Sequence, residues 1–151
     1  NRDAPFWAKC YKRLGKIYNQ YVTPKKGRPY WAKKEKSMED CIFCKIIKGE
    51  IPSTKVYEDG NVLAFKDINP AAPIHILVVP KQHIENVLEI NEENKEIASN
   101  IFLAINKIAK QLGIDQNGFR VITNCGKDAG QEVMHLHFHI LAGGKMGPKI
   151  V

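Results

Sequence analysis

The sequence has no long apolar run, no internal repeat and no low-complexity tract. A membrane-spanning helix needs about 18 or more consecutive apolar residues, so we expect no contact with a membrane. The first residues are polar and aromatic and lack the apolar core of a secretory signal. The sequence therefore predicts a cytoplasmic protein.

Cysteine is scarce, since the chain has only 4 among 151 residues. A chain of this length buries one hydrophobic core and needs no disulfide framework to fold. Cys41 and Cys44 form a CxxC pair. Cys10 and Cys125 stand alone, which is typical of plain buried or surface thiols.

Acidic residues are almost absent from the first quarter of the chain. Residues 1–37 carry 11 of the 23 lysines and arginines but only Asp3 and Glu35 as acids, whereas residues 38–151 carry 12 basic and 14 acidic residues. The first segment also holds seven of the 13 aromatic residues. We therefore divide the chain into a basic aromatic N-terminal extension, 1–37, and a domain, 38–151.

Nucleic acid binding is one possible role of the extension, because basic side chains meet phosphates and aromatic rings stack on bases. The alternatives are a solvated tail, an arm packed on a partner subunit, or a segment upstream of a natural start at Met38. Leu14, Ile17 and Tyr21 could form the apolar stripe of a short helix, which keeps the packed arm open. The role of residues 1–37 stays unassigned.

Apolar periodicity predicts an α+β fold. A short helix is predicted after Asp40 as N-cap, ending near Gly49 and Pro52, and a long amphipathic helix from Glu92 to Leu112. These helices accompany a mostly antiparallel sheet that is covered on one face, in which the apolar run 74–80 is buried on both faces. The five predicted strands are KVYED (55–59), NVLAFKD (61–67), IHILVVP (74–80), FRVITN (119–124) and HLHFHILA (135–142).

Three histidines alternate with apolar residues in HLHFHIL, residues 135–141. On a strand His135, His137 and His139 share one face, while the apolar residues between them share the other. Three imidazoles on one face could hold a catalytic zinc. One imidazole could instead act as a nucleophile while its neighbours fix its tautomer and assist the leaving group. The third alternative is that they merely decorate a solvent face.

Two segments resemble the histidine triad (HIT) family, in particular its histidine-triad nucleotide-binding branch. They are DINPAAPIHILVVPKQHI (67–84) and NCGKDAGQEVMHLHFHILAGG (124–144), and the resemblance covers residues 39–148. It implies a HIT-like fold whose five-stranded antiparallel sheet continues across a homodimer. It also implies an enzyme, a purine nucleoside phosphoramidase that hydrolyses purine nucleoside 5′-phosphoramidates and aminoacyl adenylates.

The resemblance also implies a role for individual residues, without an organic cofactor. His137 would attack phosphorus and form a nucleotidyl-histidine, and His139 and His75 would complete the polar cluster around it. Backbone and side-chain donors would bind the phosphate oxygens, and an apolar slot would hold the base. The implied substrate contacts are Asn124, Gln131, Glu132 and Val133 near the phosphate, Asp67 at the ribose, and Ile42, Phe43, Ile46, Phe65 and Ile68 around the base.

Glu132 departs from the animal members of the family, which carry a serine at this position. Gln-Glu-Val at 131–133, Ala-Gly-Gly at 142–144 and the closing KMGPKIV resemble the bacterial members. A carboxylate near the phosphate should alter which leaving groups are accepted, and the tail often sets this preference in the branch. The resemblance therefore leaves the leaving group open.

The CIFCKII stretch, 41–47, resembles histidine triad proteins that hold zinc on two cysteines and two histidines. It implies the ligands Cys41, Cys44, His83 and His135 in a closed tetrahedral site with a structural role. A redox CxxC would follow a strand within βαβ units, whereas this one lies on a predicted helix in another architecture. We therefore expect zinc.

Two other functions stay open. The first is hydrolysis of diadenosine polyphosphates or nucleic-acid adenylates, with the basic extension recruiting the substrate. The second is a non-catalytic nucleotide-binding scaffold that uses a dimer surface for its partners. Loss of turnover on substitution of His137 would exclude the scaffold.

Overall fold

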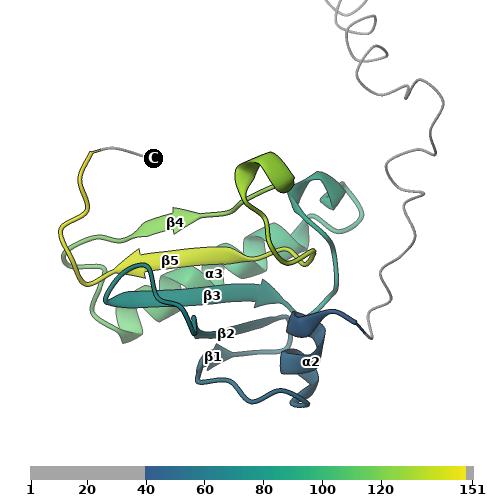
Figure 1. The fold of residues 1–151 in the computed structure, drawn as a ribbon, viewed down its shortest axis with the longest axis horizontal. Coiled ribbons are helices and arrows are strands. Elements are labelled where there is room, and N and C mark those ends of the chain that lie inside the picture. Colours follow the sequence, from purple (N-terminus) through teal and green to yellow (C-terminus); the bar gives the residue numbers. More distant parts are fainter. Residues whose placement is uncertain (1–39, 149–151) are drawn as a thin grey trace, which may run out of the picture. The chain divides into compact units, whose positions relative to one another are not determined.

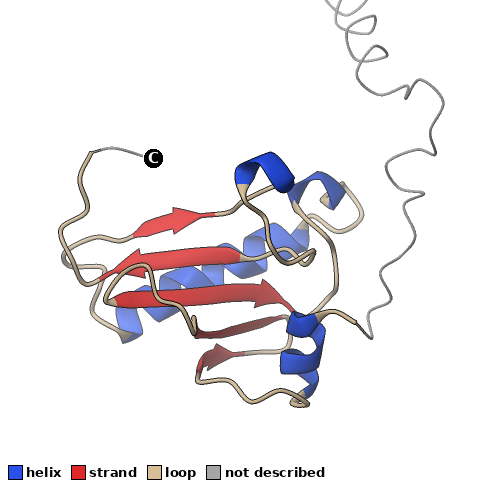
Figure 2. Ribbon diagram, viewed as in Figure 1, coloured by secondary structure: helices blue, strands red, loops and turns tan. Residues whose placement is uncertain are grey.

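The computed structural model describes residues 40–148, which form an α+β fold around one five-stranded sheet (Figures 1 and 2). The strand order is β1-β2-β3-β5-β4, and every neighbouring pair is antiparallel. The predicted sheet with one short and one long helix is confirmed. The elements are α2 (Ile42–Lys48), β1 (Lys55–Glu58), β2 (Val62–Lys66), β3 (Ile74–Pro80), η2 (Val87–Glu89), α3 (Glu96–Gln111), β4 (Arg120–Ile122), η3 (Lys127–Ala129) and β5 (Phe138–Ala142).

The two faces of the sheet are covered by different helices. Figure 1 shows α3 lying behind the sheet, where its buried side chains Ile101 and Ile108 pack with Ile76 and Ile140. On the opposite face α2 packs on a second apolar cluster. The prediction of one covered face was therefore incomplete, whereas the prediction that β3 is buried on both faces is confirmed.

Both helices begin later than the sequence predicted. Cys41, not Asp40, is the N-cap of α2, and no side-chain cap bond is present there. The long helix begins at Glu96 because the residues before it form turns in which Asn91 and Asn94 bond to backbone N–H groups. No helix among residues 40–148 is long and apolar enough to cross a membrane.

The strand that carries the histidines is shorter than predicted. It begins at Phe138, so residues 135–137 precede the sheet ladder. The backbone N–H of Leu136 donates to the carbonyl of Ile84 at 2.7 Å, and that of His135 donates to Val133 at 2.9 Å. The segment is thus held by the chain beyond β3 and by its own turn.

The predictions made for residues 1–37, including Cys10 and a helix around Leu14, lie outside the described residues. Cys125 is a free, half-buried thiol after β4, as expected for an isolated cysteine.

Truncating a core leucine is expected to destabilise the domain. Leu63 in β2 is fully buried under α2, so Leu63→Ala removes buried apolar surface and leaves a cavity. We expect the free energy of unfolding to fall by about 2–5 kcal/mol in chemical denaturation. Leu88→Ala is the matched control, since Leu88 is 71% exposed and its loss should change stability little. Equal losses in both variants would contradict the assigned core.

Candidate active site

The three predicted catalytic histidines meet at the junction of β3 and β5. His139 pairs with Leu77 across these strands, and His75 lies two residues before Leu77, so both imidazoles share the face that α2 covers. His137 immediately precedes β5. The ring centroids of His75 and His139 lie 5.1 Å apart, as do those of His137 and His139. The structure therefore brings these side chains into one cluster.

A backbone carbonyl fixes the tautomer of His137. Its Nδ1 lies 2.7 Å from the carbonyl oxygen of His135. A carbonyl oxygen only accepts hydrogen bonds, so Nδ1 carries the proton of the neutral ring. Nε2 is then unprotonated and presents a lone pair. The Thr123 hydroxyl donates to the carbonyl of His137 at 2.8 Å and holds the backbone of this residue in turn.

A backbone N–H sets the tautomers of the other two histidines. The Ala71 N–H donates to Nδ1 of His75 at 3.1 Å, so the neutral His75 ring carries its proton on Nε2. That Nε2 lies 2.8 Å from Nδ1 of His139 and 3.4 Å from a carboxylate oxygen of Asp67. Donation to Nδ1 of His139 leaves the His139 proton on Nε2. His139 is thereby oriented as a proton donor.

The surroundings of His139 keep its ring neutral. Its pKa is lowered to about 4, chiefly by burial and then by the neighbouring His137 and His75, while Asp67 acts in the opposite direction. A neutral ring at pH 7 agrees with the tautomers that the hydrogen bonds require. The neutral ring therefore presents one N–H group, at Nε2, as a hydrogen-bond donor.

A second group brings together Cys41, Cys44, His83 and His135, whose ligand atoms all lie within 4.8 Å of one another. The His135 Nδ1 is 3.5 Å from the Cys41 sulfur and 3.6 Å from the Cys44 sulfur. The His83 Nδ1 is 3.3 Å from Cys44 and 3.2 Å from the His135 Nδ1. Tetrahedral zinc would separate sulfur and nitrogen by about 3.5 Å and two nitrogens by about 3.3 Å. These residues fit a tetrahedral metal ion.

The protonation of this group also suits a metal. Nε2 of His135 lies 2.9 Å from the carbonyl of Pro80, so it carries the proton and leaves the Nδ1 lone pair for the ligand position. The pKa of His135 is lowered to about 4, mainly by burial. The pKa of the Cys44 thiol is raised to about 11, mainly by burial and then by Cys41. A bound cation is what stabilises thiolates in such surroundings.

Asp67, His75 and His139 form another group with three convergent ligand atoms. Its backbone partner argues against a metal there. A metal on Nε2 of His75 requires the proton on Nδ1, where the Ala71 N–H already donates. This group is therefore a hydrogen-bonded relay, whereas the cysteine-containing group suits a metal ion.

The predicted slot for the base divides into buried and exposed residues. The Phe43 ring packs edge-on against His135 and His137, with centroid separations of 5.9 and 5.3 Å. It thus forms an apolar wall beside His137. Of the other four residues, Ile46 and Phe65 are buried in the same cluster, and Ile42 and Ile68 are 46% and 91% exposed.

The predicted phosphate contacts lie on the loop between β4 and β5. Asn124 is half-buried just after β4, and Val133 is half-buried before the histidines. Glu132 is exposed and lines a cavity of about 210 Å³ that also reaches Cys41 and His83. Gln131 is buried, and its carboxamide bonds to backbone groups. Within this loop Val133 packs on the apolar cluster under α2, on the face of the sheet opposite α3.

Sequence reasoning missed several groups that orient the histidines. The Pro80 and His135 carbonyls and the Ala71 N–H are backbone atoms, which carry no residue-type signal. Thr123 has a side-chain role, but a threonine next to a strand is too common to be noticed. The sequence pattern therefore gives no signal for these orienting groups.

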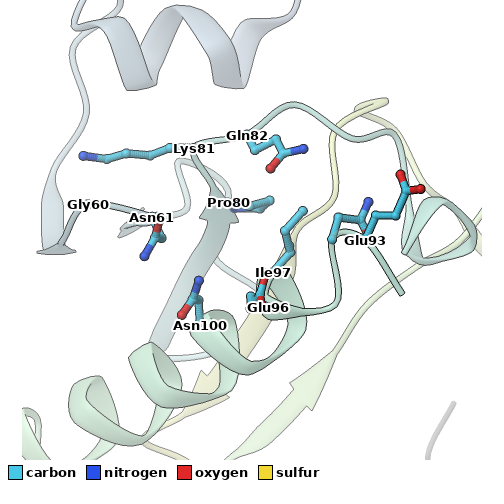
Figure 3. A pocket seen from close by; sticks show the side chains of 10 residues that line it. Gly60, Asn61, Pro80, Lys81, Gln82, Glu93, Glu96, Ile97 and Asn100 are labelled. Carbon is cyan, nitrogen blue, oxygen red and sulfur yellow. The ribbon is translucent and has the colours of Figure 1, made fainter. Parts of the chain in front are cut away.

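A larger cavity, of about 500 Å³, lies elsewhere (Figure 3). It opens between the β1–β2 turn, the end of β3 and the start of α3, and none of the five histidines lines it. Lys81 lines this cavity, but its Nζ is bound to Glu58 at 2.9 Å. The chemistry of the histidines is therefore separate from this cavity.

Comparisons with known proteins agree with this arrangement. The HIT domain model matches residues 48–146. A HIT-like protein of Buchnera aphidicola is 54% identical over 105 residues, which cover 70% of this chain and 94% of that protein. The purine nucleoside phosphoramidase of Escherichia coli K12 is 44% identical over 112 residues, 74% of this chain and 94% of that protein.

Solved structures show the same fold. A HIT family hydrolase from Clostridium thermocellum has a TM-score of 0.74 and 60% identity, covering 76% of this chain and 100% of its own. A histidine triad protein from Clostridium difficile has a TM-score of 0.71 and 64% identity, covering 73% and 96%. The likeness thus extends over nearly the whole length of both relatives.

Acid is expected to weaken the fold through His139. Its pKa is about 4 in the folded protein against 6.5 ordinarily, so the unfolded chain binds more protons between these values. The contribution of His139 to the free energy of unfolding should be complete above pH 6.5 and should fall as the pH drops toward 4. We expect a shallower fall for His139→Gln than for the wild type, measured by chemical denaturation at each pH.

The variant must be compared with the wild type because His135 also takes up protons between pH 6.5 and 4, so the wild-type curve alone does not isolate His139. Asn106→Gln, a change on the exposed side of α3, should give a curve parallel to the wild type. A curve for His139→Gln that is also parallel to the wild type would contradict the lowered pKa of His139.

Proposed function

The chain belongs to the histidine triad (HIT) family of hydrolases, and from that premise we propose that it is a purine nucleoside phosphoramidase. The observation that carries the proposal is the hydrogen bond between Nδ1 of His137 and the His135 carbonyl, which leaves Nε2 of His137 as a lone-pair nucleophile. The relative from Escherichia coli K12 that bears the name purine nucleoside phosphoramidase supports the substrate class.

In the proposed first step, Nε2 of His137 attacks the α-phosphorus of a nucleoside 5′-phosphoramidate. The phosphorus–nitrogen bond to the leaving amine breaks as a new bond to Nε2 forms, giving a nucleotidyl-histidine. The leaving nitrogen takes up a proton from solvent, because the neutral His139 ring would become an imidazolate if it gave up its only proton. The Nε2–H of His139 donates a hydrogen bond to the leaving nitrogen. The same chemistry would apply to an aminoacyl adenylate, whose leaving group is a carboxylate and needs less assistance.

In the second step, water attacks the nucleotidyl-histidine. The attacking water loses one proton to solvent, the bond between phosphorus and Nε2 of His137 breaks, and the nucleoside monophosphate leaves. His75 holds Nδ1 of His139 as an acceptor throughout, through the 2.8 Å contact between them. Each group therefore returns to its starting protonation state after one turnover.

Substrate binding is proposed to follow the predicted contacts. Negative charge that builds on the phosphate oxygens would be stabilised by Asn124 and the Val133 N–H. Asp67 would accept hydrogen bonds from the ribose hydroxyls with the carboxylate oxygens that face the cluster. Phe43, with the exposed Ile42 beside it, would supply an apolar surface for the purine.

We further propose that Cys41, Cys44, His83 and His135 hold zinc. Two thiolates and two neutral imidazoles at these separations are the ligand set that zinc prefers, and they fill all four positions. A closed site leaves no position for water, so the ion would tie α2 to the segment before β5 and supply stability rather than a reactive hydroxide.

A homodimer is also part of the proposal. Phe102 and Leu103 lie on α3 with more than half of each side chain exposed, although both are large and apolar. Such residues support a surface that a second copy would cover. Nucleic acid binding through residues 1–37, and with it hydrolysis of nucleic-acid adenylates, stays an alternative that concerns residues outside the described part of the chain.

Replacing the nucleophile is expected to abolish hydrolysis. His137→Ala should lower kcat for a fluorogenic adenosine phosphoramidate by at least about 10³-fold, since no nucleotidyl-enzyme can form. His139→Gln should be slower than the wild type yet still yield a nucleotidyl adduct on the peptide that carries His137, detected by mass spectrometry after rapid quenching in alkaline denaturant, where the phosphorus–nitrogen bond survives. Unchanged turnover by His137→Ala would contradict the proposal of an enzyme and favour a binding scaffold.

Removing the metal is expected to lower stability more than the intrinsic rate. Chelation should lower the melting temperature by at least about 10 °C, because binding free energy of a structural ion adds to folding. Cys44→Ser should lose the zinc measured by elemental analysis, whereas Cys125→Ser, at a free thiol outside the group, should retain it. A metal-free protein that stays equally stable but inactive would contradict the structural role.

A further inference from the structure

One buried side chain joins the segments that surround the histidine cluster. Gln131 is 5% exposed, and its carboxamide has three backbone partners. Oε1 accepts the Gly126 N–H at 2.9 Å, and Nε2 donates to the carbonyls of Glu85 at 2.7 Å and Val133 at 3.0 Å. Both hydrogens and the oxygen of the amide are thereby used.

The bonds to Gly126 close the loop that follows Asn124. The Gln131 N–H donates to the Gly126 carbonyl at 3.1 Å, while the side chain of Gln131 accepts the N–H of the same glycine. Gly126 has a φ of 83°, a conformation that favours glycine. These two hydrogen bonds therefore hold the two ends of the loop 126–131 together. Asn124 lies two residues before the first of these ends.

The other two bonds fix the approach to the nucleophile. The Glu85 carbonyl holds Gln131, and the neighbouring Ile84 carbonyl holds the Leu136 N–H at 2.7 Å. The segment 131–136 is thus clamped at both ends against residues 84–85. Within it the Val133 carbonyl receives both Gln131 Nε2 and the His135 N–H, at 3.0 and 2.9 Å.

We propose that Gln131 is a positioning residue for hydrolysis, which sets Asn124 and the Val133 N–H at the correct distance from His137. The inference rests on the proposed function, because it concerns the groups that would bind the phosphate oxygens. It also changes the role that family resemblance gives to Gln131. With its carboxamide fully bonded to the backbone, Gln131 acts through the loop and its side chain makes no contact with the nucleotide.

A positioning residue should affect the transition state more than the bound ground state. Misplaced donors lose most where charge develops on the phosphate oxygens, so Gln131→Met should lower kcat. Methionine has nearly the length of glutamine but can neither donate nor accept at the three backbone partners. A substrate contact would instead be lost in the ground state as well, which raises KM.

The test compares Gln131→Met with Gln116→Met, a matched change at an exposed glutamine after α3. Each protein is assayed with an adenosine phosphoramidate at a temperature where circular dichroism shows it folded, and AMP affinity is measured by calorimetry. We expect Gln131→Met to lose about 10- to 100-fold in kcat, with KM and AMP affinity within about threefold of the wild type. Gln116→Met should match the wild type in all three.

An unchanged kcat for Gln131→Met, or a rise in KM and in the AMP dissociation constant with kcat unchanged, would overturn the inference. Should the variant not fold, amide hydrogen exchange of the wild type decides. The Gly126 N–H should exchange far more slowly than an unprotected amide, and exchange at the unprotected rate would overturn the inference. Wild-type protein that fails to hydrolyse the phosphoramidate would instead refute the proposed function, which separates the two results.

Discussion

The hydrogen bond from Nδ1 of His137 to the His135 carbonyl is the contact on which the site depends. It is 2.7 Å long and decides which nitrogen of His137 keeps its lone pair. The same residue 135 places its side chain among the cysteines and His83. Its neighbour Leu136 enters the core beneath α3. Three consecutive residues thus connect the group of two cysteines and two histidines, the hydrophobic core and the proposed nucleophile, His137.

This contact is possible because β5 begins only at Phe138. In a continuous strand, carbonyls bond to neighbouring strands, and side chains two residues apart do not reach them. The segment 135–137 is instead held by Ile84 and by its own turn at Val133. The His135 carbonyl is thereby free to accept from the His137 ring. The departure from ideal strand geometry, which alternation alone did not reveal, is what orients the His137 ring.

Side-chain patterns predicted the sheet and both main helices, because burial and alternation depend on residue type. The grouping of His75 and His83 with the other histidines was implied only by the family resemblance. The start of α2 was missed, since Asp40 has the chemistry of an N-cap but Cys41 holds that position in the structure. The parts of the site supplied by backbone atoms could not be predicted. The N–H of Ala71 and the carbonyl of Pro80 orient imidazoles whatever side chains those residues bear.

Three of the five histidines differ by the backbone group that faces one nitrogen of the ring. A carbonyl behind His135 and another behind His137 each accept a hydrogen bond from the ring N–H and leave a lone pair on the other nitrogen, which in His135 lies beside the two cysteines. An N–H behind His75 has the opposite effect and turns the ring toward His139 as a donor. One residue type can therefore present different nitrogens and tautomers within a few ångströms, because some of the rings face a backbone acceptor and another faces a backbone donor.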